Sequence, residues 1–155
     1  MKKFRFRLQK LLDIRESNEK RIKNELASVL GVQNVERVKI DNINKNIEQQ
    51  KRIFSEKMRK NEMSAEEAIK FERYIDSSLR AIDATQVKID ELEPAVQEIR
   101  DRLVIASRDK KVVEKLKERQ YEDYLYEVKM AEFKENDDMN QKLYARRKFM
   151  EVEYD

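Results

Sequence analysis

The stretch RKNEMSAEE, residues 59–67, determines how the rest of the chain is interpreted. Within it, Ser64 can accept a hydrogen bond from the amide of Glu67 while the Glu67 side chain reaches back to the Ser64 amide, the reciprocal capping box that begins a helix. Residues 59–63 before it are few and polar, which favours a tight reversal. The sequence therefore predicts two helices that lie antiparallel on either side of this stretch.

Before the reversal, apolar residues recur at alternating steps of three and four, which is the narrow seam of a coiled coil. Seven of the ten seam positions are apolar; the set is Ile22, Leu26, Val29, Gln33, Glu36, Ile40, Ile43, Ile47, Gln50 and Phe54. The pattern extends back through Arg15 and Leu12 to Leu8, so we expect a first helix over about residues 3–59. Gly31 lies inside it and weakens it by up to about 1 kcal/mol relative to Ala.

After the reversal, a second seam predicts a longer helix over about residues 65–150, with fraying at its end. The seam consists of Phe71, Ile75, either Ser78 or Leu79, Ile82, Ile89, Leu92, Val96, Ile99, Leu103, Ala106, Lys110 and Val113. Pro94 lies within this pattern and costs a helix of order 3 kcal/mol, so we expect a kink near it. The apolar pattern keeps its phase across Pro94, which favours one bent helix over two separate helices.

Antiparallel pairing about the reversal brings Ile75 to the level of Glu48, Ile89 to that of Asn34 and Leu103 to that of Lys20. Residues after about Tyr121 then have no partner in the first helix. This tail is nevertheless rich in large apolar residues, namely Tyr124, Leu125, Tyr126, Val128, Met130 and Phe133. Such a surface predicts contact with another protein.

Composition agrees with an all-α chain. Of its 155 residues 43% are charged and 39% are hydrophobic, with only one Gly and one Pro, so the chain lacks the turn-forming residues that a sheet needs at each reversal. No stretch rich in Pro, Gly or Ser divides it. We expect one elongated domain over residues 1–155, an antiparallel two-helix coiled-coil hairpin.

The residue types present argue against catalysis and ligand chemistry. There is no Cys and no His, which removes thiolate sites and the commonest general base and metal ligand. One glycine cannot build a glycine-rich phosphate-binding loop. Carboxylates on such helices are ordinarily solvated or paired with Lys and Arg. We therefore expect no enzymatic activity, no cofactor and no metal.

The first 24 residues carry an excess of positive charge, with nine Lys and Arg against Asp13, Glu16 and Glu19. Two interpretations stay open: these cations keep a narrow helix soluble, or they dock onto an acidic surface of another protein. Nucleic acid is not expected as a partner. The basic segment lacks the interspersed aromatic residues of single-strand binders, and the sequence contains no recognised DNA-binding module.

A strip of mostly small residues runs beside the second seam: Tyr74, Ser78, Ala81 and Thr85. It either permits the close approach of a partner or places Tyr74 as a cover over the edge of the seam. Spacing by itself favours neither.

Three segments carry a resemblance to a known family. The opening FRFRLQKLLDIRE, residues 4–16, continuing through Glu19 to Glu25 and Leu26, resembles the N-terminal signature of the FliJ family. Leu116 to Arg119, then Tyr124 and Leu125, then EFKENDD, residues 132–138, resemble the C-terminal helix of that family. Between them, the segment 74–82 is similar to the part of the second helix nearest the reversal.

The resemblance implies a non-enzymatic component of the flagellar type III protein export apparatus. Its fold would be a coiled-coil hairpin similar to the central stalk of rotary ATPases. Its implied partners are the export ATPase FliI, the export-gate protein FlhA and export chaperones. It would be a monomer in isolation, cytoplasmic, and held at the cytoplasmic face of the flagellar base, in peripheral association with the membrane, through these partners.

The resemblance also implies site residues. The ATPase-contacting set would be Phe4, Arg5, Arg7, Leu8, Leu11, Leu12, Arg15, Leu116, Tyr124, Leu125 and Phe133. The gate-contacting set would be Tyr74, Ser78, Ala81 and Thr85, with Ser78 and Thr85 standing where the family usually has larger side chains.

The alternative from another functional class is a structural scaffold, a homo-oligomeric coiled coil. A hairpin stays monomeric on dilution, whereas a parallel two-chain rod dissociates. The capping box at Ser64 and the polar reversal before it favour the hairpin.

Overall fold

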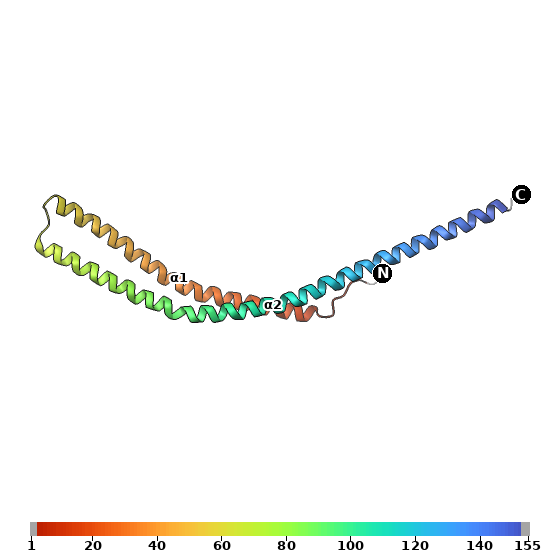
Figure 1. Cartoon of the computed structure of the whole chain (residues 1–155), viewed down its shortest axis with the longest axis horizontal. Helices are drawn as coiled ribbons and strands as arrows, with labels where there is room; N and C mark the ends of the chain where they lie inside the picture. Colours follow the sequence, from red (N-terminus) through yellow and green to blue (C-terminus); the bar gives the residue numbers. More distant parts are fainter. Residues whose placement is uncertain (1–2, 153–155) are drawn as a thin grey trace. The chain divides into compact units, whose positions relative to one another are not determined.

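The structure is a computed structural model that describes residues 3–152, and these contain two long helices and no strand. Helix α1 runs over Gln9–Arg59 and helix α2 over Ala65–Val152. Figure 1 shows the reversal between them, where the ribbon changes from yellow-brown to yellow-green. The two helices pack against each other, so the predicted all-α, two-helix hairpin is confirmed. The fraying expected at the end of the second helix falls on residues 153–155, outside the described residues.

The chain divides into two compact units. The hairpin unit comprises residues 18–106 and contains the reversal. The terminal unit combines residues up to Ser17 with those from Ser107 onwards. The expectation of one elongated domain stays a prediction.

The reversal is built from two helix caps. Asn61 adopts a left-handed conformation, with φ of 57°. The amide of Glu62 donates to the carbonyl of Lys57 at 3.0 Å, and the amide of Asn61 donates to that of Met58 at 3.2 Å. This is the pair of bonds of a Schellman motif, with Asn in the position that Gly usually takes because both residues tolerate a positive φ.

The capping box predicted for the second helix is present. The Glu67 amide donates to Ser64 Oγ at 3.2 Å, and the Ser64 amide donates to Glu67 Oε2 at 3.3 Å. Lys57 Nζ also pairs with Glu67 Oε1 at 3.2 Å, which ties the end of α1 to the start of α2. One carboxylate thus joins both helices at the reversal.

In the hairpin unit, the buried residues follow the predicted seams. Ile22 and Ile47 of α1 and Ile89, Val96, Ile99 and Ala106 of α2 are buried. Either Ser78 or Leu79 was expected in the seam of α2. Ser78 occupies it, because Ser78 is half-buried and Leu79 is exposed. The expectation that Gln50 lies in the seam is wrong, because this residue is exposed. A polar side chain near the end of the pair gains more from water than from an apolar seam.

Contacts between the helices confirm the antiparallel pairing close to the expected levels. The rings of Phe54 and Phe71 stack with centroids 4.2 Å apart, and Arg102 forms a salt bridge with Glu25. Gln33, rather than the expected Asn34, meets Ile89. The alignment therefore differs from the expected one by about one residue at this level.

Gln33 is the most deeply buried polar side chain of the seam, with 1% of its surface exposed. Its Nε2 donates to the Ile89 carbonyl at 3.3 Å and to Glu93 Oε2 at 3.0 Å. Both acceptors lie in the turn of α2 that precedes Pro94, and α2 continues through that proline. The preference for one continuous helix is confirmed, while the kink near Pro94 stays a prediction.

In the terminal unit, α1 begins at Gln9 and not near residue 3, which corrects the expected boundary. Residues 3–6 are not helical and residues 7–8 form a turn. Phe6 and Leu12 are buried with Val113 of α2, and Phe4 and Leu11 pack against this cluster. The packing of both phenylalanines on α2 outweighs the helical bonds that residues 3–8 would otherwise make.

We expect Gly31→Ala to stabilise the chain. A methyl group on Gly31 would meet nothing within 4 Å, and this glycine is not among the residues with positive φ. The gain in the free energy of unfolding should be about 0.5–1 kcal/mol, because Ala loses less backbone entropy in a helix. Thermal unfolding followed by circular dichroism measures it, with Gly31→Val expected between the two. Equal or lower stability of the Ala variant would contradict a regular, open helix here.

We also expect the reversal to lose stability in acid. The hydrogen bond from the Ser64 amide, followed by the side chain of Lys57, lowers the pKa of Glu67 below its ordinary value of 4.5. A lowered carboxyl pKa stabilises the fold fully above pH 4.5, and this contribution disappears as pH falls through the folded-state pKa.

The test compares melting temperatures of the natural chain and Glu67→Gln from pH 7 to pH 3. The natural chain should be more stable at pH 7, and the difference should shrink below about pH 4.5. Glu66→Gln is the matched control, since the hydrogen-bonded carboxylate of the capping box belongs to Glu67 and Glu66 is exposed. A difference that stays constant with pH would rule out the assigned role of the Glu67 carboxylate.

Candidate functional site

The terminal unit contains a short arm, residues 3–8, that packs on α2 through Phe4 and Phe6. Phe6 is buried and Phe4 half-buried, whereas Arg5 between them and Lys3 and Arg7 on either side are exposed. The arm therefore holds α2 with its aromatic side and presents its cationic side to solvent.

Aromatic contacts hold the beginning of the arm. The ring centroid of Phe4 lies 5.2 Å from that of Tyr121 in an edge-to-face arrangement, and 5.6 Å from that of Tyr124. Such pairs contribute about 0.5–1.5 kcal/mol beyond the burial of their surface. Tyr121 and Tyr124 thus have a partner in the chain, although it comes from the arm and not from α1.

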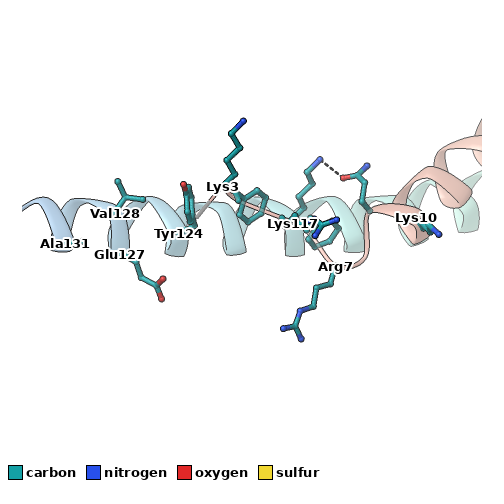
Figure 2. A pocket seen from close by; sticks show the side chains of 12 residues that line it. Lys3, Arg7, Lys10, Lys117, Tyr124, Glu127, Val128 and Ala131 are labelled. Carbon is teal, nitrogen blue, oxygen red and sulfur yellow. Dashed lines mark hydrogen bonds between the residues drawn. The ribbon is translucent and has the colours of Figure 1, made fainter. Parts of the chain in front are cut away.

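Polar contacts fix α1 to α2 just after the arm. Lys117 Nζ donates to Gln9 Oε1 at 2.9 Å, the dashed line in Figure 2. Further along α1, Arg15 Nη1 donates to Asp109 Oδ2 at 2.7 Å. These bonds fix where the arm can lie on α2.

A groove runs between the arm and α2. Figure 2 shows Lys3, Tyr124 and Val128 on one side of the ribbon and Arg7 and Glu127 on the other. Its lining carries five cations, Lys3, Arg5, Arg7, Lys10 and Lys117, against the single carboxylate of Glu127. The groove therefore combines an apolar floor with a positive rim, which suits an acidic protein surface.

The residues expected to contact an ATPase all lie in the terminal unit, with unequal exposure. Arg5, Arg7 and Leu8 are exposed on the arm. The half-buried members of the set are Phe4, Leu11, Arg15 and Tyr124. Leu116, Leu125 and Phe133 are exposed on α2. Leu12 is buried in the core, so it supports the surface and is not itself available to a partner.

Sequence reasoning missed the arm, and with it the parts played by Phe6, Tyr121 and Lys117. The signal was present in KFRFR, residues 3–7, where cations and phenylalanines alternate with a period of two. That period is typical of an extended segment with one buried side, whereas a helix repeats every 3.6 residues.

The residues expected to contact the export gate lie on α2 in the hairpin unit, and they do not form one exposed strip. Tyr74 and Ala81 are exposed, Ser78 is half-buried and Thr85 is buried. The Thr85 hydroxyl donates to the Ala81 carbonyl at 2.8 Å, within its own helix. Tyr74 lines a groove with Phe54, Phe71 and Met63 beside the reversal.

The part of the chain that the structure describes lacks two further features. It holds no group of three or more acidic, His or Cys side chains placed to bind a metal ion. Neither described helix has a window long and apolar enough to cross a membrane.

Comparison with known proteins supplies the family. The model of the family described as flagellar FliJ protein matches residues 4–149, which is nearly the whole chain. No curated protein and no solved structure gives a significant match. The family match agrees with the two-helix hairpin and with the resemblance of both ends of the sequence. The chain therefore belongs to the FliJ family and is a flagellar protein associated with the export apparatus.

Proposed function

We propose that this chain is a non-enzymatic, stalk-like coiled coil that binds the export ATPase FliI and the export-gate protein FlhA, and that helps couple ATP hydrolysis to protein export. The observation that carries the proposal is the pairing of α1 with α2 of the same chain. This pairing buries the apolar seam within one chain and leaves charged and aromatic surfaces free for other proteins. The chain acts by binding, and none of its residues carries out bond chemistry.

The terminal unit supplies the ATPase contact. Its cationic arm and the groove beside it offer positive charge around an apolar floor. Exposed cations steer association and fix orientation against an acidic surface, although each one adds little affinity by itself. On α2, Leu125 and Phe133 add exposed apolar area.

The hairpin unit supplies the gate contact. Tyr74 is the large exposed side chain of the proposed set, and aromatic residues commonly carry most of the binding energy of an interface. Ala81, also exposed, allows close approach. Ser78 and Thr85 support this surface from the seam side. Export chaperones, and the location at the cytoplasmic face of the flagellar base, belong to the same proposal.

Reversing the charge of the arm should weaken ATPase binding. With Arg5→Glu, Arg7→Glu and Lys10→Glu combined, we expect at least a roughly tenfold loss of affinity for purified FliI, because attraction becomes repulsion at the contact. Titration calorimetry at two salt concentrations measures the loss of affinity and how far salt screens the charge interaction. These three side chains are exposed, so the fold should persist.

The matched control reverses three exposed cations of α1 in the hairpin unit, Arg37→Glu, Lys45→Glu and Lys51→Glu. It changes the net charge by the same amount and should leave the affinity nearly unchanged. If both triple variants lose affinity equally, net charge and not the arm governs binding.

Removing the Tyr74 ring should weaken binding to FlhA. We expect Tyr74→Ala to lower the affinity roughly tenfold or more, as for a central aromatic contact. The control is Tyr126→Ala, which removes a more exposed tyrosine in the terminal unit. The measurement is binding to the purified cytosolic part of FlhA. Unchanged affinity of the Tyr74 variant would count against this surface.

A further inference from the structure

The face of α2 that pairs with the rest of the chain continues beyond the last internal contact. In the terminal unit, the buried and half-buried residues Val113, Lys117, Tyr124 and Val128 follow the three-and-four spacing of the seam. The same spacing continues through Ala131 to Glu135, Asp138, Lys142, Ala145 and Phe149, all of which are exposed. These residues, with Glu132 and Arg146 beside them, are called the free seam; they lie in the blue part of α2 in Figure 1.

The charges of the free seam are separated along the helix. Its first half carries Glu132, Glu135 and Asp138, with Lys134 on the other flank, and its second half carries Lys142 and Arg146, with Lys148 on the other flank and no acid. Other charges of the segment, such as Asp137 and Arg147, point away from the free seam at 3.6 residues per turn. A helix with this pattern is complementary to a second copy of itself placed antiparallel, because each acidic half then meets a basic half.

The apolar residues fit the same arrangement. Rotation about a two-fold axis near residue 140 places Asp138 opposite Lys142 of the second copy and Glu132 near its Arg146. It also places Phe149, which is 79% exposed, opposite Ala131 of the second copy. Ala131 and Val128 line the groove beside the arm. The ring of Phe149 therefore reaches an apolar recess that already exists in the other molecule.

We propose that two copies of this chain pair antiparallel through the free seam, with Phe149 of each seated in the groove of the other. This goes beyond the proposed function and needs no other component of the export apparatus. The contact is isologous, so it closes as a dimer and does not extend into a filament. It rests largely on exposed ion pairs, so it is weak, salt-sensitive and lost on dilution to single hairpins.

Sedimentation of the full-length chain over a range of concentrations at low salt tests this pairing. One variant carries Glu132→Lys, Glu135→Lys and Asp138→Lys, and another carries Lys142→Glu and Arg146→Glu. Each variant alone should associate at least roughly tenfold more weakly, because like charges then face each other. An equimolar mixture should regain association, since one free seam is now basic and the other acidic.

Matched controls separate the free seam from the opposite face. Asp137→Lys with Arg147→Glu changes charges that point away from the free seam and should leave association unchanged. Phe149→Ser should weaken association, whereas Phe133→Ser on the opposite face should not. The proposal is overturned if the natural chain stays monomeric at every concentration, if mixing fails to restore association, or if the controls weaken it as much as the free-seam variants do.

Discussion

The rest of the structure depends on the apolar seam that α1 and α2 of one chain bury against each other. A pair of helices has only one such seam, and burial of its Ile, Leu and Val side chains at about 25 cal/mol per Å² is the main stabilising term available. Because the two helices of one chain bury these side chains against each other, the other faces of both helices are free to carry charge. This is the physical reason why a chain with 43% charged residues folds without a thick core.

The seam is not wholly apolar, and its polar members give it direction. Gln33 donates both of its bonds to the turn before Pro94, while its Oε1 has no protein hydrogen-bond partner. Burying such an oxygen costs stability, so an apolar residue would hold the helices together at least as well. A buried amide instead favours the alignment in which its bonds form. At the reversal, the bonds of Ser64 and Asn61 favour the same alignment.

The terminal unit packs in a different way from the hairpin unit, and it carries the surfaces proposed to bind the ATPase and a second copy of the chain. Its arm is not helical, and it places two phenylalanines on α2 and the neighbouring cations Lys3, Arg5 and Arg7 in solvent. A helix over the same residues would distribute these side chains around its circumference. The non-helical arm therefore concentrates positive charge beside an apolar groove. The ATPase contact proposed above uses this concentration, whereas the pairing of two copies uses the apolar residues of the groove.

Much of this protein could be predicted from its sequence because the dominant signals are local or periodic. The capping box at Ser64 and the seam spacing determined the reversal, the two helices and their antiparallel pairing. The residues of both proposed contact sets came from the resemblance to a family, and the match over residues 4–149 confirms that family while leaving the contacts as proposals.

Only the tertiary structure decided which of those residues reach solvent. Whether Ser78 or Leu79 faces the seam, and whether Thr85 is buried, depends on a rotation of α2 that spacing leaves open by one residue. The arm depends on a competition between helical hydrogen bonds and the packing of Phe4 and Phe6 on α2. That packing partner lies more than a hundred residues away in the sequence, so local propensity could not weigh it.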